Sequence, residues 1–324
     1  MHYLRNQFAR VCWDNSVSGY HIVNKGVRQG GLISPMLFKF YIDSMVNSIS
    51  ASHVVGCSLG PTKINIIAYA DDIVLLAKSE CNLSTLYKML KSEISELQLK
   101  INVKKNKAVI FSGVIPDLSY PTVLSLDGDQ ISVEKCFKYL GHYIERGLED
   151  TTNTKVRLND FYAKFNSVFR NFHKLKIQTL LFLFNTYCLP NFGIELWNSN
   201  RLMQNQHFKV FETAFSNALK RMLSVPRYAS SHIAAEKCNQ LLFRHLVSKI
   251  QLRYYQRLRN HKNAIIRLNF PFLRNGFHTT FVENNFKINY KVNINDNDID
   301  ALYARIGWTQ RNEQRSRICP FFDC

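Results

Sequence analysis

The sequence contains a pair of adjacent aspartates between two short apolar segments. Residues 65–69 and 73–77 are apolar runs of strand length, and they meet at Tyr69-Ala70-Asp71-Asp72. Two such runs around a short polar turn predict a β-hairpin. Neighbouring carboxylates repel each other, and burying them is costly unless a cation compensates. Mg²⁺ is the natural compensation because it binds carboxylate and phosphate oxygens together. A solvated hairpin tip, where aspartate is common, is the alternative.

The spacing of apolar residues elsewhere predicts an α+β first half and a helical second half. Residues 35–50 are expected to be helical with proline in the first turn, and strands are expected near 108–111 and 137–140. Three stripes have helical spacing: Leu83, Leu86, Leu90, Ile94 and Leu97; Phe161, Phe165, Val168, Phe172 and Leu175; and Phe208, Phe211, Phe215, Leu219 and Met222. We interpret the two phenylalanine-rich stripes as core, with base-stacking platforms as the alternative. The composition changes near residues 148–153, which predicts domains at 1–147 and 148–324.

The net charge of +18 is concentrated in the second half of the chain. Residues 1–150 hold 16 Lys/Arg and 14 Asp/Glu, whereas residues 151–324 hold 26 and 10. Lys249, Arg253 and Arg257 stand four residues apart, which places three cations on one face of a predicted helix. A surface of this kind neutralises phosphates without regard to base sequence, so we expect an acidic partner such as a nucleic acid. A basic, solvated face that only aids solubility is the alternative.

The cysteines and the apolar runs bear on the compartment. Eight cysteines are scattered along the chain, which favours reduced thiols in an intracellular compartment, either nucleus or cytoplasm. The most apolar run, 180–189, is too short to cross a bilayer, so no membrane partner is expected. Cys319 and Cys324 form a Cys-x₄-Cys pair, but zinc needs four ligands and no further Cys or His lies near them. Free thiols are the expectation, with a shortened zinc knuckle as the alternative.

Four motifs follow one another in a characteristic order. They are Gly26-Val27-Arg28-Gln29-Gly30-Gly31-Leu32-Ile33-Ser34-Pro35; Tyr69-Ala70-Asp71-Asp72; Leu99-Lys100-Ile101-Asn102 with Lys104-Lys105; and Phe137-Lys138-Tyr139-Leu140-Gly141. This succession resembles the reverse transcriptases of non-LTR retrotransposons (LINE-like, Jockey-type), strongly over residues 11–145 and loosely through 228. The resemblance implies a right-hand polymerase palm, an antiparallel sheet with helices, followed by an α-helical thumb and C-terminal region. It also implies RNA-directed DNA polymerase activity by two-metal nucleotidyl transfer, with Mg²⁺ (or Mn²⁺), an RNA template, a DNA primer and deoxynucleotides.

The resemblance also assigns roles to residues of the catalytic motifs. Asp71 corresponds to the metal ligand proper, and Asp72 supports it. Lys105 falls where the family has a lysine that protonates the pyrophosphate leaving group, or it lies on a solvated face. The family usually has threonine next, whereas this chain has Asn106. Tyr69 would form the floor on which the primer end rests, or it would simply pack.

Further roles concern the nucleic acid and the nucleotide. The stretch of Arg28, Gln29, Gly30 and Gly31 corresponds to the loop that contacts the template and the incoming nucleotide, or is only a loop and helix cap. Residues Tyr139, Leu140 and Gly141 correspond to the turn that grips the primer strand, or form an ordinary turn. The basic half would clamp an RNA–DNA duplex through Lys249, Arg253 and Arg257.

One catalytic element of the family is not found in this sequence. Polymerases of this kind have an aspartate in an earlier strand, but Asp14 is the only one before Gln29, and it corresponds to the segment next to the loop. Neither the fingers nor an endonuclease domain is recognisable. We therefore expect the chain alone to bind metal weakly and to polymerise poorly or not at all. The competing function is a catalytically inactive nucleic-acid-binding remnant of a retroelement; an unrelated helical DNA-binding protein would leave the four motifs as coincidence.

Overall fold

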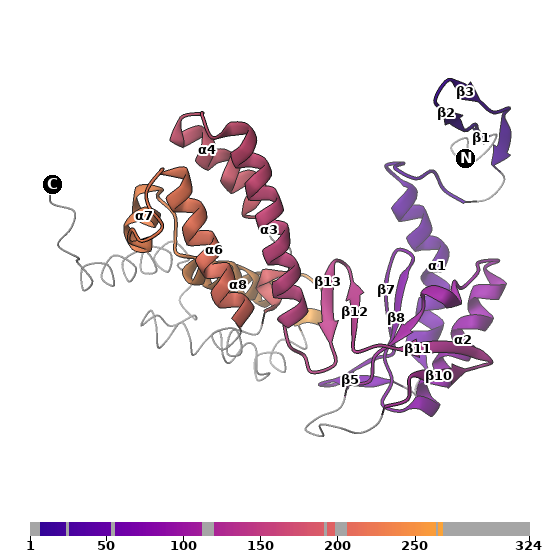
Figure 1. Ribbon diagram of the computed structural model, residues 1–324. Helices are drawn as coiled ribbons and strands as arrows, with labels where there is room; N and C mark the ends of the chain where they lie inside the picture. The colour runs from indigo at the N-terminus through magenta and orange to yellow at the C-terminus, as the bar shows by residue number, and fades with distance from the viewer. Residues whose placement is uncertain are drawn as a thin grey trace, which may run out of the picture. The chain divides into compact units, whose positions relative to one another are not determined.

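The chain divides into two compact units. The computed structural model describes residues 7–23, 26–52, 56–111, 120–190, 193–197, 206–263 and 265–267 (Figure 1). Unit 1 comprises Met1–Asn106 and Val123–Ile131, and unit 2 comprises Lys107–Thr122 and Ser132–Cys324. The structure combines helices with small, mostly antiparallel sheets, which confirms the predicted mixture of α and β elements.

Unit 1 holds two long helices and a series of hairpins. The helices are α1 (Ser34–Ala51) and α2 (Glu80–Glu96). The strands are β1 (Gln7–Ala9), β2 (Cys12–Trp13), β3 (Ser16–Val17), β4 (His21–Val23), β5 (Cys57–Leu59), β6 (Thr62–Ile64), β7 (Ile66–Tyr69), β8 (Asp72–Leu75) and β10 (Val123–Leu126). Antiparallel pairs form between β1 and β4, β2 and β3, β5 and β6, and β7 and β8. The limit between the units falls within β11 (Asp129–Val133), and the sheet order there is β10-β11-β9.

The core of unit 1 lies between α1, α2 and one face of the β7–β8 hairpin. Its fully buried members include Ile42, Met45 and Ile49 of α1 and Leu86 of α2. The spacings of three and four residues put each set on one helix face, which is why the predicted stripe of α2 is buried around Leu86, Leu90 and Ile94. This packing fixes the base of the hairpin whose tip holds the two aspartates.

Only one face of the β7–β8 hairpin is buried, although both strands are apolar along most of their length. Ile66 is 7% exposed, whereas its neighbour Ile67 is 43% exposed. Successive strand residues point to opposite faces, so Ile66 faces the core and Ile67 faces away from it. An apolar run alone does not distinguish a strand with one covered face from a strand with two.

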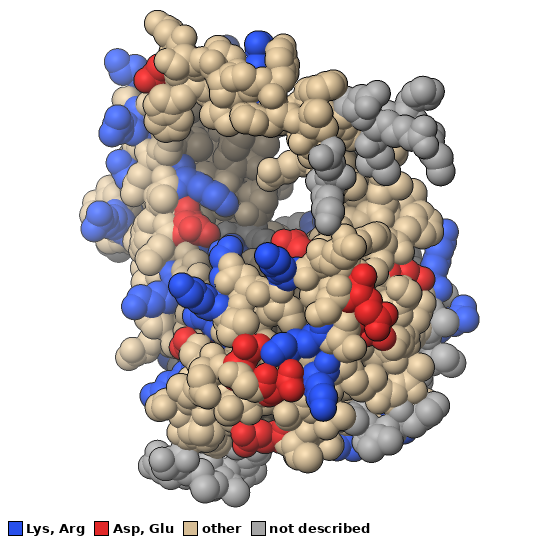
Figure 2. All heavy atoms as spheres, turned by 90° about the vertical axis from the view of Figure 1, so that its right-hand side faces the viewer, with Lys and Arg blue, Asp and Glu red and all other residues tan. Residues whose placement is uncertain are grey.

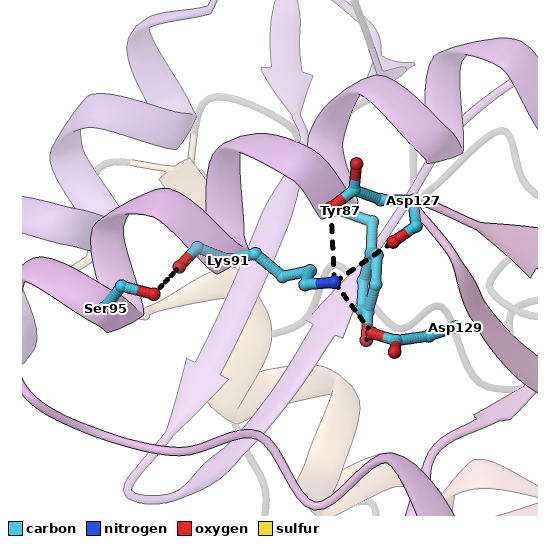
Figure 3. A network of polar contacts seen from close by, with 5 residues as sticks. All are labelled: Tyr87, Lys91, Ser95, Asp127 and Asp129. Atoms are coloured by element: carbon cyan, nitrogen blue, oxygen red, sulfur yellow. Dashed lines mark hydrogen bonds and ion pairs between the residues drawn. The ribbon is translucent and has the colours of Figure 1, made fainter.

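A polar cluster attaches α2 to the β10–β11 turn (Figure 3). The Lys91 Nζ lies 3.2 Å from an Asp127 carboxylate oxygen and 3.1 Å from an Asp129 carboxylate oxygen. The Tyr87 hydroxyl donates a hydrogen bond of 2.8 Å to Asp129. Asp127 and Gly128 both have positive φ (48° and 83°), as a two-residue hairpin turn of type I′ requires. The cluster thus joins a helix to a turn that lies far from it in sequence.

This cluster predicts a loss of stability in alkali. Burial and the bond to Asp129 raise the pKa of Tyr87 from 10.0 to about 12. Between these two pKa values the folded protein keeps the proton of the Tyr87 hydroxyl, whereas the unfolded chain has lost it. The contribution of Tyr87 to the free energy of unfolding is therefore complete below about pH 10 and disappears as the pH rises through about 12. Urea midpoints measured between these limits should fall more steeply for the wild type than for Tyr87→Phe. Tyr228→Phe, at a 92% exposed tyrosine, should behave as the wild type; equal slopes in all three proteins would refute the assignment.

Unit 2 is mainly helical. Its helices are α3 (Thr151–Phe172), α4 (Ile177–Leu183), α6 (Gln206–Met222), α7 (Ser231–Lys237) and α8 (Phe243–Arg259), and its strands include β9 (Lys107–Ala108), β12 (Cys136–Tyr139) and β13 (His142–Glu145). A π-helical turn at Phe184–Cys188 continues α4, and a 3₁₀ turn occupies Ile194–Leu196. The core is rich in aromatic rings, and Phe211 and Phe243 stack with centroids 4.4 Å apart.

The two phenylalanine-rich stripes differ in how much of each is buried. All five predicted members of the α6 stripe are buried, from Phe208 to Met222. In α3, Phe161, Phe165 and Val168 are buried, but Phe172 is 42% exposed and Leu175, just beyond the helix, is 44% exposed. The prediction of a core role is therefore wrong for these last two residues, because the packing partners of α3 end before they are reached.

The surface of the first half of the chain carries both signs of charge, as its nearly equal numbers of Lys/Arg and Asp/Glu predict. Figure 2 looks onto the side where α1, α2, β10 and β11 lie in Figure 1, and basic and acidic side chains are interspersed there.

Within the described residues no helix is long and apolar enough to cross a membrane. The cysteines in the described ranges (Cys12, Cys57, Cys81, Cys136, Cys188 and Cys238) are free thiols. Cys319 and Cys324 lie outside the described residues.

Candidate functional site

The two aspartates lie at the tip of a tight hairpin in unit 1. Tyr69 at the end of β7 pairs with Asp72 at the start of β8, so Ala70 and Asp71 alone form the turn. Ala70 has a φ of 52°, the left-handed region that a residue with a Cβ rarely adopts. The two-residue connection imposes this conformation, because turns that match the twist of the strands need positive φ. The turn and the first residue of β8 thereby expose both carboxylates at the tip of the hairpin.

The carboxylates themselves are exposed, which corrects one step of the sequence argument. Asp71, Asp72 and Tyr69 are all exposed, with Tyr69 at 63%. The cost of burying two like charges therefore does not arise in the described structure. Neither aspartate forms an ion pair or a side-chain hydrogen bond within the described ranges of the chain, so both are available to a ligand from outside.

Because the turn is strained at Ala70, the stability of unit 1 should depend on the size of the side chain at this position. Ala70→Val should lower the free energy of unfolding of unit 1 by about 1–2 kcal/mol, because a β-branched side chain is poorly accommodated at positive φ. Ala70→Gly should be tolerated, since glycine adopts this conformation without steric cost. Chemical denaturation measures both variants. A valine variant as stable as the glycine variant would mean that Ala70 does not hold this conformation.

The predicted nucleotide and template loop precedes α1. The Arg28 carbonyl accepts a hydrogen bond of 3.1 Å from the Gly31 amide and one of 2.6 Å from the Ser34 hydroxyl. Gly30 has a φ of +78°, and a Cβ added there would meet nothing within 4 Å. Glycine is thus needed for the backbone conformation and not for internal packing. Arg28 and Gln29 are exposed.

The predicted leaving-group lysine also lies in unit 1. Lys105 is exposed and ends the 3₁₀ turn Val103–Lys105, in which its amide donates to the Asn102 carbonyl. The next residue, Asn106, replaces the usual threonine of the family. Its side chain acts to lower the pKa of Tyr87, against the larger effects of burial and of Asp129.

The predicted primer-strand turn belongs to unit 2. Tyr139 pairs with His142, and the two turn residues, Leu140 and Gly141, have positive φ values of 46° and 81°. The Arg157 guanidinium of α3 donates a hydrogen bond of 2.6 Å to the Gly141 carbonyl. Asn153 of the same helix contacts the His142 ring at 2.6 Å, and burial lowers the pKa of His142. The first turns of α3 thus hold the β12–β13 turn in place.

The cationic stripe of α8 is narrower than predicted. Arg253 and Arg257 are exposed, but Lys249 is only partly exposed, and burial together with the charge of Arg253 lowers its pKa. The buried face of the helix is centred on Phe243, Val247, Leu252 and Tyr255. Leu246 and Ile250 of the same helix are partly buried against the core of unit 2.

The predicted groups are distributed over both units. The Arg28–Gly31 loop, the Tyr69–Asp72 turn and Lys105 belong to unit 1, whereas the Tyr139–Gly141 turn and α8 belong to unit 2. Asp14, the only aspartate before Gln29, occupies the exposed β2–β3 turn and not a strand. The contacts of Arg157 and Asn153 were missed from the sequence, because nothing in a helix pattern indicates which loop a polar side chain reaches.

The donor set at the hairpin tip suits Mg²⁺ but is small. Mg²⁺ keeps several of its waters and is commonly held by one or two carboxylates together with substrate phosphates. Asp71 and Asp72 provide two such carboxylates without competing partners. Within the described residues there is no group of three or more His, Cys, Asp or Glu side chains that could hold a metal ion. The chain's residues therefore fit a metal that arrives with a phosphate-bearing substrate better than a metal enclosed by protein.

Comparison with known proteins places this geometry in context. Residues 2–144 match the family described as reverse transcriptase (RNA-dependent DNA polymerase). The chain is 30% identical over 129 residues to the retrovirus-related Pol polyprotein from type-1 retrotransposable element R2 of Popillia japonica, covering 37% of this chain and 18% of that protein. It is 22% identical over 268 residues to the RNA-directed DNA polymerase from mobile element jockey of Drosophila funebris, covering 79% and 28%. The type-2 retrotransposable element R2DM polyprotein of Drosophila melanogaster is 32% identical over 171 residues, covering 51% and 16%. The chain spans less than a third of the length of each of these relatives.

Proposed function

Since residues 2–144 of this chain belong to the reverse transcriptase family, we propose that it contributes to an RNA-directed DNA polymerase that extends a DNA primer on an RNA template. The observation that carries the proposal is the Asp71-Asp72 pair, exposed at the tip of a hairpin whose base is fixed in the core of unit 1. In this proposal residues 1–147 form the palm, and residues 148–324 form a helical thumb and C-terminal region.

Mg²⁺, with Mn²⁺ as a substitute, would be held by Asp71 with support from Asp72. When bound, the metal ions would activate the primer 3′-hydroxyl and stabilise charge on the leaving pyrophosphate, as in two-metal nucleotidyl transfer. Tyr69, exposed one residue before the turn, offers a ring on which the terminal base pair of the primer could rest. The Lys105 ammonium would donate a proton to the pyrophosphate or screen its charge.

The remaining residues would bind and orient the nucleic acids. Arg28 and Gln29 would contact the template and the incoming deoxynucleotide, and Gly30 and Gly31 would let the substrate approach the backbone closely. The Tyr139–Gly141 turn would contact the primer strand, held in place by Arg157. Arg253 and Arg257, with Lys249, would neutralise phosphates of the RNA–DNA duplex.

A second candidate function is a nucleic-acid-binding remnant without polymerase activity. The observation in its favour is the excess of Lys/Arg over Asp/Glu in residues 151–324, which number 26 and 10. Such a surface would bind nucleic acid even if the hairpin tip held no metal. The two functions differ in whether the bound complex responds to a particular nucleotide.

Nucleotide-dependent stabilisation of a primer complex tests the proposal without requiring turnover. The chain is bound to poly(rA) with an oligo(dT) primer that ends in a dideoxynucleotide, in the presence of Mg²⁺. The polymerase proposal predicts that dTTP slows dissociation of the complex, whereas dGTP does not, and that chelation of the metal abolishes the difference. Dissociation that is the same with dTTP, dGTP and no nucleotide would overturn the proposal in favour of the remnant.

A further inference from the structure

The corner between α3 and α4 exposes apolar side chains that the sequence pattern assigns to the core. Phe172, the last residue of α3, is 42% exposed, and Leu175 is 44% exposed. Phe161 and Phe165, earlier on the same stripe, are 1% and 5% exposed. Helix α3 thus extends past the packed interior of unit 2 and ends in a corner without a covering partner among the described residues (Figure 1).

This corner is also strongly basic. From Phe161 to Ile194 the sequence contains Lys164, Arg170, Lys174 and Lys176 but no Asp or Glu. All four cations are exposed, and none forms an ion pair within the part of the chain that the structure describes. Three of them flank the exposed Phe172 and Leu175 at intervals of one to three residues. A cluster of unpaired cations around apolar surface is a poor arrangement for stability and fits an anionic ligand.

Neighbouring elements hold the base of the corner firmly. The Arg221 guanidinium of α6 lies 4.3 Å from the centroid of the Phe169 ring and donates a hydrogen bond of 3.3 Å to Asn166. The His173 ring packs against Phe169 at 5.7 Å. The last turn of α3 is therefore anchored through Phe169, one residue before Arg170, while Phe172 projects from a fixed base.

The next helix adds a second exposed ring. Phe182 of α4 is 65% exposed, although Leu180 of the same helix is 2% exposed. The π-helical turn that follows packs against α3, with Phe184 fully buried, and leaves Tyr187 57% exposed. Insertions of this kind into helices are frequent at functional sites because they change which side chains face outward. Exposed rings thus occur on both helices that meet at the corner.

The combination of cations and exposed rings indicates the form of the ligand. Every nucleobase has a π-face that stacks on an aromatic ring, and lysine and arginine neutralise the backbone between bases. A duplex hides the faces of its bases except at its ends, so it would satisfy the cations but not the rings. A single strand satisfies both. We propose that the α3–α4 corner, defined by Arg170, Phe172, Lys174, Lys176 and Phe182, binds single-stranded nucleic acid.

This surface is separate from the stripe on α8, and its function does not depend on polymerase activity. Within the proposed function it would hold an unpaired stretch of RNA before or after it takes part in a duplex. A membrane surface with anionic lipids also combines charge with apolar depth, so vesicle binding serves as the competing outcome. The exposed rings lie at a fixed corner between two helices and not along one continuous amphipathic face, which favours the nucleic acid.

Crosslinking and affinity together test the proposal on the full 324-residue chain. Single-stranded oligo(rU) containing 5-iodouridine, which crosslinks to rings that stack on it, should attach at Phe172 or Phe182, as mapped by peptide mass spectrometry. Phe172→Ala should weaken binding of oligo(rU) about fivefold or more, and Phe172→Trp should restore it. Phe40→Ala makes the same change at a 72% exposed ring on α1, which lies outside the corner and has one neighbouring cation, Lys39, and it should leave the affinity unchanged. Replacing Lys174 and Lys176 by glutamine should reduce the slope of log K against log salt by about 1.4.

The outcomes separate this proposal from the proposed polymerase function. Phe172→Ala should leave the stabilisation by dTTP of the primer complex intact, and Asp71→Asn should leave oligo(rU) binding intact. The proposal is overturned by an unchanged oligo(rU) affinity of Phe172→Ala, or by crosslinks confined to other segments. The proposal is also overturned if the corner variants lose more affinity for duplex than for single-stranded RNA. It is likewise overturned if they lose more affinity for phosphatidylserine vesicles than for RNA. If both corner variants bind normally while dTTP still stabilises the primer complex, only this inference fails.

Discussion

Asp71→Asn is expected to weaken Mn²⁺ binding to the chain's complex with poly(rA)·oligo(dT) and dTTP by about tenfold to a hundredfold. The change removes one negative charge and one strong oxygen ligand while keeping the shape of the side chain. Electron paramagnetic resonance of free Mn²⁺ measures the affinity directly and needs no catalytic turnover. The stabilisation of the primer complex by dTTP should be lost in parallel.

A matched control distinguishes the site from a general loss of negative charge. Asp43 lies on α1, is exposed, and accepts a hydrogen bond of 3.0 Å from Asn47. Asp43→Asn makes the same chemical change away from the hairpin tip and should leave Mn²⁺ affinity unchanged. Asp72→Asn should have an intermediate effect, since its role is to support Asp71. Equal affinity in the wild type and in Asp71→Asn would remove the hairpin tip from the metal site.

Reversing the charges of Arg253 and Arg257 together is expected to weaken binding of an RNA–DNA duplex by about tenfold to a hundredfold at low salt. Each phosphate contact that is lost also lowers the slope of log K against log salt by about 0.9, so the slope should fall by about two. Both arginines are exposed on α8, which is fixed to the core of unit 2 through Phe243 and Val247. The variants should therefore fold normally.

The control for this prediction makes the same change in net charge at another position. Lys209 of α6 and Lys237 of α7 are also exposed in unit 2. Reversing both of these charges alters the total by the same amount, so it separates a contact surface from an overall electrostatic attraction. If the two double variants weaken duplex binding equally, the stripe on α8 has no special role. An unchanged salt slope in the Arg253 and Arg257 variant would refute the assignment.

Local features of the fold could be predicted well from the sequence. The hairpin around Asp71 and the helix near Leu86 lie within a few residues of their predicted limits, because a tight turn and a regular apolar stripe are determined by neighbours in the chain. The stripe on α6 is buried along its whole length for the same reason. The candidate site residues could likewise be proposed from short motifs, since each motif is contiguous.

Features that depend on distant contacts could not be predicted. A stripe shows which face of a helix is apolar but not how far its partner extends, so the exposure of Phe172 was missed. The same limitation explains Ile67, whose strand is covered on one face only. The bonds from Lys91 to Asp129 and from Arg157 to Gly141 join residues whose proximity exists only in the folded chain.

Metal-directed cleavage of the backbone tests whether the metal is bound at Asp71 and Asp72. Fe²⁺ replaces Mg²⁺ at carboxylate sites and, with ascorbate and peroxide, generates radicals that cut the chain close to the bound ion. With the chain bound to poly(rA)·oligo(dT) and dTTP, cleavage should centre on residues 69–73, decrease with excess Mg²⁺ and disappear in Asp71→Asn. Cleavage confined to other carboxylates, such as those of Asp127 and Asp129, or a pattern that Asp71→Asn does not change, would show that the hairpin tip does not hold the metal.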